Sequence, residues 1–107
     1  MDIRRVDEHR KRDHLPLLLL ADEQEDMVER YLTRGTMFAL DKDGATAGVC
    51  VVTDEGDRVL EIKNLAVDPA HQRRGLGRAL IEFVAARARG RYDALQVGTG
   101  DSPLTVP

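Results

Sequence analysis

Residues 60–89 constrain the fold of this chain more than any other stretch. They begin with alternating apolar and polar residues, which is typical of a strand, and Asp68-Pro69 ends that strand. Proline ends it because its ring fixes φ and leaves no N–H for a neighbouring strand. A helix is predicted from about Gly75, because apolar residues recur there on one face at helical spacing. They are Leu76, Leu80, Ile81, Val84 and Ala88.

The strand itself has an irregular pattern. Its apolar residues are Leu60, Ile62, Leu65 and Val67. Their alternation slips by one residue at Lys63-Asn64, which a β-bulge would accommodate. Because a bulge bends its strand, we expect the strand to splay from a neighbour at this point.

The start of the predicted helix suits an anion. Backbone N–H groups at a helix start have no partner within the helix, and the helix dipole adds positive charge there. Gly75 and Gly77 let a phosphate approach the main chain closely, and Arg73, Arg74 and Arg78 add formal charge. A pyrophosphate is the expected ligand. From the spacing alone, the glycines as a mere helix start and the arginines as a solvated face stay open as an alternative.

Two common nucleotide motifs do not fit this turn. A dinucleotide fingerprint needs a third glycine where Leu80 stands. A phosphate loop of the Walker type ends in Gly-Lys-Ser or Gly-Lys-Thr, and the sequence contains neither.

The segment Gln72–Gly77, after a strand that ends in Leu65–Pro69, resembles the acetyl-CoA motif of the GNAT family of N-acetyltransferases. The family pattern is Gln/Arg-x-x-Gly-x-Gly/Ala, and the resemblance is closest across residues 59–100. It implies acetyl-CoA as the acyl donor, with its pyrophosphate on the amides of the turn and its pantetheine arm along the strand end. The coenzyme-binding residues implied are Leu65, Ala66, Val67, Gln72, Arg73, Arg74, Gly75, Leu76, Gly77, Arg78 and Ala79.

The resemblance also implies the reaction, which is direct attack of a primary amine on acetyl-CoA in a ternary complex. The bulge would free the Leu65 N–H to stabilise the thioester oxygen. Glu61 stands where several family members carry the general base, so it is the candidate for that role. The alternative for Glu61 is an exposed strand residue paired with Lys63 or Arg58. Asp101 and Ser102 are weaker site candidates.

The order of predicted elements indicates an α+β (α/β-mixed) fold in one domain, residues 1–107. We expect a mixed, mostly antiparallel sheet with helices on both faces, as in acyl-CoA N-acyltransferases. The predicted strands are 2–6, 37–41, 46–53, 60–67 and 92–97, and the predicted helices before residue 75 are 8–21 and 23–33. Asp7 is the expected N-cap of the first helix, and Pro16 should kink or split it. The second helix should turn Met27, Val28, Tyr31 and Leu32 inward.

The family resemblance extends beyond the end of this sequence. Members continue with a helix and two strands, typically through Tyr-x-x-x-Gly-Phe, which supplies the general acid. We therefore expect a truncated C-terminal part and an incomplete domain. The strand 92–97 would then leave an edge open to pairing, which a second copy could cover as a homodimer.

Composition narrows the function classes. The net charge is −3 and the positive charge is concentrated at residues 73–91, so a nucleic-acid binder is the least favoured alternative. A non-catalytic acyl-CoA-binding module is the main alternative to an enzyme. Cys50 is the only cysteine, and His9 and His14 lack partners at metal-ligand spacing, so we expect neither a disulfide nor a metal. The longest apolar run, 15–21, is too short for a membrane, and we expect a cytoplasmic protein.

Overall fold

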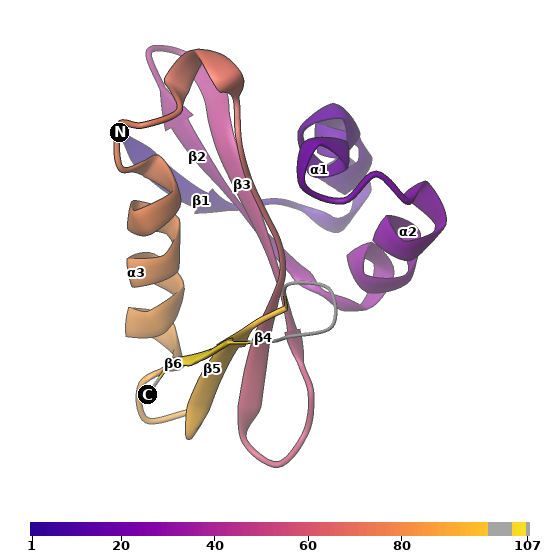
Figure 1. Cartoon of the computed structure of the whole chain (residues 1–107), viewed down its shortest axis with the longest axis vertical. Helices are drawn as coiled ribbons and strands as arrows, with labels where there is room; N and C mark the ends of the chain where they lie inside the picture. Colours follow the sequence, from indigo (N-terminus) through magenta and orange to yellow (C-terminus); the bar gives the residue numbers. More distant parts are fainter. Residues whose placement is uncertain (99–103, 107) are drawn as a thin grey trace.

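The computed structural model describes residues 1–98 and 104–106, and their strands form one six-stranded sheet in the order β1 to β6 (Figure 1). The strands are β1 (Asp2–Arg5), β2 (Thr36–Lys42), β3 (Ala45–Asp54), β4 (Val59–Val67), β5 (Ala94–Val97) and β6 (Leu104–Val106). All neighbouring pairs are antiparallel except β4 and β5, which are parallel. Helix α3 (Leu76–Ala88) connects that pair, as a parallel crossover requires. The predicted mixed, mostly antiparallel sheet is confirmed.

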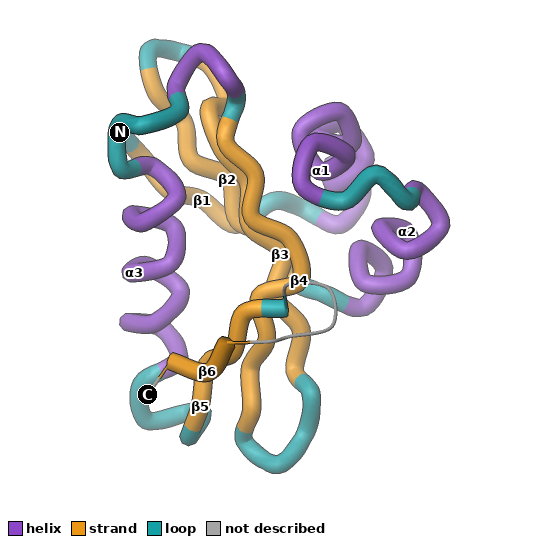
Figure 2. The backbone as a smooth tube through the Cα atoms, viewed as in Figure 1, coloured by secondary structure: helices purple, strands orange, loops and turns teal. Residues whose placement is uncertain are grey.

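Helices cover both faces of the sheet, as predicted (Figures 1 and 2). Helix α3 packs on one face through Leu76, Leu80 and Val84, against a cluster that includes Leu40 and Ile62. A 3-10 helix (η1, Glu8–His14), α1 (Leu15–Ala21) and α2 (Glu25–Arg34) lie on the opposite face. Their core residues are Leu18, Val28, Tyr31 and Leu32, packed against Met37, Val49 and Val51.

The single helix predicted for residues 8–21 is split at its proline. Pro16 lies in the first turn of α1, where the missing N–H removes no helical hydrogen bond. The preceding residues form the 3-10 helix η1. Asp7 does precede it, and its carbonyl accepts a hydrogen bond from the Arg10 N–H at 2.9 Å. The expected side-chain cap is wrong, because the Asp7 carboxylate makes no cap hydrogen bond.

Lys11 links η1 to the end of α2 through side-chain hydrogen bonds. Its side chain is 3% exposed, and Nζ donates to the carbonyls of Leu32 at 2.8 Å and Gly35 at 2.5 Å. Glu8 supplies a carboxylate at 2.8 Å from the same ammonium. The buried charge is therefore paired, and carbonyls at a helix end that need donors receive them.

The predicted bulge in β4 is confirmed. Asn64 pairs with Val51 and Ile62 pairs with Val52, so Lys63 is the extra residue of β4. The insertion restores the alternation, because Leu60 and Ile62 before it, and Leu65 and Val67 after it, all pack in the core on the α3 face.

Three expectations need correction. Residues Tyr92 and Asp93 precede β5 rather than belong to it. The edge of β5 is not open at residues 95–97, because β6 pairs antiparallel with it from Leu95↔Val106 to Val97↔Leu104. Met27 does not turn into the core and is 38% exposed, whereas the other three α2 residues predicted inward are buried.

Candidate functional site

The turn before α3 is held by local hydrogen bonds. The Asp68 carboxylate accepts from the Ala70 N–H at 2.9 Å, which starts the short 3-10 helix η2 (Pro69–His71). The Gln72 side chain then donates to the Val67 carbonyl at 3.1 Å and ties the turn to the end of β4. Arg73 and Gly75 have φ values of 65° and 77°, a left-handed conformation that suits glycine best.

The backbone of this turn offers free donors. The first intrahelical bond of α3 runs from the Ala79 N–H to the Gly75 carbonyl at 3.0 Å. The N–H groups of Leu76, Gly77 and Arg78 therefore lie before the first helical hydrogen bond. The Ala79 N–H is engaged in that bond and is therefore not a free donor.

The side chains keep the approach to these donors open. Leu76 is 3% exposed and points into the core, while Arg73 and Arg74 are exposed. At Gly75 no atom lies within 4 Å of the place where a Cβ would be. Arg78 pairs with Glu82 at 2.9 Å, so part of its predicted charge at the turn is offset.

The turn lies next to residues 64–67 of β4, which we call the free part of β4 because, within the described residues, only β3 pairs with it. A Cβ at Gly77 would lie 3.8 Å from Val67 and 3.9 Å from Leu65 side-chain atoms. Strand β5 pairs with β4 only from Val59 to Ile62, and the Gly98 N–H gives a further bond to the Ile62 carbonyl at 3.0 Å. Beyond the bulge, residues 64–67 pair with β3 alone in the part of the chain that the structure describes. Pairing between β4 and the described part of β5 therefore stops at the bulge, as a splay of these two strands requires.

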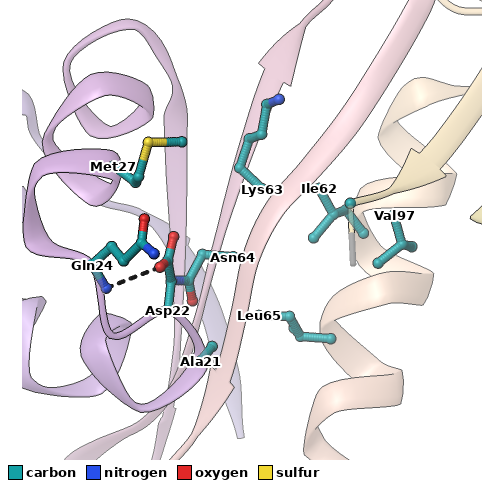
Figure 3. A pocket seen from close by; sticks show the side chains of 10 residues that line it. Ala21, Asp22, Gln24, Met27, Ile62, Lys63, Asn64, Leu65 and Val97 are labelled. Carbon is teal, nitrogen blue, oxygen red and sulfur yellow. Dashed lines mark hydrogen bonds between the residues drawn. The ribbon is translucent and has the colours of Figure 1, made fainter. Parts of the chain in front are cut away.

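A cavity of about 850 Å³ opens beside this splay (Figure 3). One wall comes from β4 and the end of β5, and the other from the end of α1 and the start of α2. The residues that line it are Ala21, Asp22, Gln24, Met27, Ile62, Lys63, Asn64, Leu65, Val97 and Gly98. A cavity of this size can hold a small organic ligand.

A hydrogen-bond chain joins the two walls. Asn64 Nδ2 donates to the Leu18 carbonyl and to the Tyr31 hydroxyl, each at 2.9 Å. The Tyr31 hydroxyl donates to Asp22 Oδ2 at 3.2 Å, and Asp22 Oδ1 accepts from the Gln24 N–H at 3.1 Å (dashed in Figure 3). Burial, above all, raises the pKa of Tyr31 to about 12, so it is a neutral donor at physiological pH.

Glu61 is buried, so the alternative that it is an exposed strand residue is wrong. It is 8% exposed, with Gln96 Nε2 donating to Oε1 and the Lys63 ammonium at Oε2. The pairing with Lys63, which belonged to that alternative, is present, whereas Arg58 pairs with Asp93. Glu61 is not among the residues that line the cavity, and its partner Lys63 is. Asp101 and Ser102 lie outside the described residues.

Sequence reasoning singled out the turn before α3 and the end of β4, but it did not single out the other wall of the cavity. Asp22, Gln24 and Tyr31 carry no motif, and Asn64 is 33 residues from its partner Tyr31. Only the breakdown of alternation at Lys63-Asn64 signalled that this part of the chain is unusual.

The described residues contain no metal-binding cluster, no reactive cysteine and no helix suited to spanning a membrane. Among residues 1–98 and 104–106, no three His, Cys, Asp or Glu side chains gather closely enough to hold a metal ion. Cys50 is fully buried, and burial raises the pKa of its thiol to about 12, so it is an inert core residue. No helix in the described part of the chain has the length and apolar character needed to cross a bilayer.

Several known proteins are similar to this chain. Residues 3–102 match the family described as the Acetyltransferase (GNAT) family. An uncharacterized N-acetyltransferase, YvbK of Bacillus subtilis, is 35% identical over 89 residues, which are 82% of this chain and 57% of that protein. The chain thus spans little more than half the length of this relative.

Solved structures agree with this match. An IAA acetyltransferase from Bacillus cereus has a TM-score of 0.85 at 32% identity, over 94% of this chain and 67% of that one. A Bacillus subtilis acetyltransferase in complex with CoA has a TM-score of 0.83 at 33% identity, over 94% and 66%. A GNAT acetyltransferase from Elizabethkingia anophelis with acetyl-CoA bound has a TM-score of 0.76 at 34% identity, over 82% and 58%. These relatives are acetyltransferases, which does not favour the non-catalytic alternative. The chain belongs to the GNAT family of acetyltransferases.

Proposed function

We propose that residues 1–107 act as one domain that transfers an acetyl group from acetyl-CoA to a primary amine. One observation carries the proposal. The free N–H groups at the start of α3 lie against the free part of β4, with Gly77 in contact range of Leu65 and Val67. A helix start with free N–H groups and a strand segment that, within residues 1–98 and 104–106, pairs on one side only are thereby adjacent, which suits a ligand with a pyrophosphate and an amide-containing arm.

Acetyl-CoA is such a ligand. Its pyrophosphate would accept hydrogen bonds from the N–H groups of the turn and of the first helical residues, 73–78, with the Arg73 and Arg74 side chains nearby. Gln72 would hold the turn in place through Val67. The pantetheine arm would pair with residues 65–67 like an added strand. Two relatives solved with CoA or acetyl-CoA support this assignment.

The amine would bind in the cavity beside Leu65. Its nitrogen attacks the thioester carbonyl carbon, the C–N bond forms, the C–S bond breaks, and coenzyme A leaves as the thiolate. The Leu65 N–H would stabilise the oxyanion of the intermediate. Glu61 would take the proton from the amine, and because its partner Lys63 lines the cavity while Glu61 itself does not, we assign the transfer to a bridging water.

Release of free thiol tests this proposal. The purified chain is mixed with acetyl-CoA and a panel of primary amines, the thiol is followed with a chromogenic disulfide, and the products are weighed by mass spectrometry. We expect thiol release that depends on the amine, with an equal amount of N-acetylated product. Tight acetyl-CoA binding without acetyl transfer to any amine would contradict an enzyme and support the binding module.

Two finer features stay proposals. We infer a cytoplasmic location. The longest apolar run, 15–21, forms the short helix α1, which is too short to cross a membrane. We also propose that the chain forms a homodimer. The exposed edge strand β1 could pair with a second copy. Light scattering on the purified chain tests the homodimer, with a monomer mass as the contradicting result.

A further inference from the structure

The cavity of the candidate site carries unbalanced negative charge. Two charged side chains line it, Asp22 and Lys63. Lys63 already has carboxylate partners in Glu61 and Glu55, the second at 3.8 Å. Asp22 takes part in none of the ion pairs found within the described residues. Within the described residues the Asp22 charge is therefore not ion-paired, because Lys63, the cation of the lining, is engaged by Glu61 and Glu55.

The Asp22 carboxylate is held in place by neutral donors. The Gln24 N–H and the Tyr31 hydroxyl each give one hydrogen bond, to Oδ1 and Oδ2 respectively. A carboxylate has about four acceptor positions, so further donors can bind. These bonds fix the orientation of the group without neutralising it, which prepares it for a cation.

Asn64 adds a second, independent sign of a donor-bearing ligand. It lines the cavity, is 3% exposed, and its Oδ1 is buried without a hydrogen-bond donor among the described residues. A buried acceptor without a donor is unfavourable, so a ligand that brings an N–H group is favoured here. Asp22 on the helical wall and Asn64 on β4 both bond to the Tyr31 hydroxyl, and Figure 3 shows them next to each other where the two walls meet.

From these contacts we propose that the acceptor is a small organic amine with a second positive charge, which Asp22 binds while the other amino group reacts. The inference rests on the proposed function. The reacting nitrogen must lose its charge before it attacks, so a charge that Asp22 holds throughout the reaction has to belong to another group. An amine with a carboxylate in that place would be repelled.

Asn64 gives a direct readout of this binding. It is the only asparagine of the sequence, so a chain labelled with ¹⁵N-asparagine shows a single side-chain amide in a nitrogen–proton correlation spectrum. That amide is linked to Asp22 through Tyr31. We expect 1,4-diaminobutane to shift its signal in a saturable way, and 4-aminobutanoic acid to bind at least about tenfold more weakly. Equal affinities, or no shift with the diamine, would overturn the inference.

A pair of variants tests the residue itself. Asp22→Asn keeps an acceptor for its neutral donors but removes the charge, and Glu23→Gln removes the same charge one residue away on an exposed side chain outside the cavity lining. The diamine affinity should fall about tenfold in the first variant and stay the same in the second. A similar loss in both, or in neither, would contradict the role of Asp22. If Asp22→Asn does not fold, the comparison of the two ligands in the natural chain decides alone.

Kinetics extend the test to turnover. The ratio of kcat/KM for 1,4-diaminobutane to that for 1-aminobutane should fall about tenfold in Asp22→Asn and be retained in Glu23→Gln. A retained ratio in both variants would overturn the inference. Absence of acetyl transfer to every amine would instead contradict the proposed function, because the Asn64 titration needs neither acetyl-CoA nor turnover.

Discussion

The side-chain amide of Asn64 donates a hydrogen bond to the Tyr31 hydroxyl at 2.9 Å, and this bond ties β4 to helix α2 just beyond the bulge. The same amide reaches the Leu18 carbonyl in α1. Strand β4 and the two helices α1 and α2 on one face of the sheet thus meet at one buried polar group. Because the cavity lies between β4 and these helices, its width depends on this junction.

Removing the Tyr31 hydroxyl should weaken the junction. In Tyr31→Phe, Asn64 loses a partner and Asp22 loses a donor, so we expect a loss of about 1–2 kcal/mol in the free energy of unfolding, measured in urea. Tyr92→Phe is the control, since its hydroxyl bonds the exposed Asp54 at 3.2 Å and should matter much less. Equal losses in the two variants would show that the buried network contributes no more to the free energy of unfolding than an exposed hydrogen bond does.

The same tyrosine predicts a pH dependence. Its pKa is about 12 in the folded chain, chiefly through burial, against 10.0 in the reference state. The folded state therefore binds this proton more tightly, so the contribution is complete below pH 10 and is lost as the pH rises toward 12. Urea denaturation at pH 9 and pH 11 should show a steeper decline for the natural chain than for Tyr31→Phe. Parallel declines would contradict the assignment.

Gly35 should not tolerate a side chain. A Cβ there would lie 2.7 Å from the Tyr31 carbonyl oxygen and 2.9 Å from that of Val52, and neither backbone atom can move freely. We expect Gly35→Ala to cost roughly 2–3 kcal/mol of stability in thermal or urea unfolding. Gly77→Ala is the contrast, because its Cβ would meet atoms only at 3.8 Å and beyond, and a helical alanine is favourable. A harmless Gly35→Ala would mean that the end of α2 shifts easily.

Glu61→Gln tests the proposed base. We expect kcat to fall by on the order of 10²-fold while coenzyme affinity is retained, because only proton transfer is affected. Glu55→Gln serves as the control, since Glu55 also neighbours Lys63 but lies farther along the hairpin. The acidic limb of the pH–rate profile should disappear with Glu61. If that limb persists, another group takes the proton.

Local patterns predicted the sheet, the bulge in β4 and the start of α3. The bulge followed from the spacing of Leu60, Ile62, Leu65 and Val67, because one face of β4 had to remain apolar. The start of α3 followed from Gly75 and the apolar face of the helix. Both depend on residues close together in the sequence, where period and backbone preference act directly.

Contacts between distant residues were not predictable in this way. Lys11 is buried because carbonyls 21 and 24 residues away need donors, and no local pattern signals that. The segment of η1 is Glu-His-Arg-Lys-Arg-Asp-His, which has no apolar spacing from which a helix type could be chosen. Met27 was predicted inward from its helical spacing, but its side chain lies over the cavity instead of the core.

Calorimetric titration of coenzyme A tests the central claim most directly. Gly75 and Gly90 flank α3 at opposite ends, with φ values of 77° and 78° and no atom within 4 Å of a Cβ position. Glutamate at either site thus adds the same strain and charge, but only Gly75→Glu places them at the proposed pyrophosphate. We predict that Gly75→Glu weakens coenzyme A binding at least about tenfold and that Gly90→Glu binds like the natural chain. Equal affinity in the two variants would contradict the assignment of the coenzyme to the start of α3.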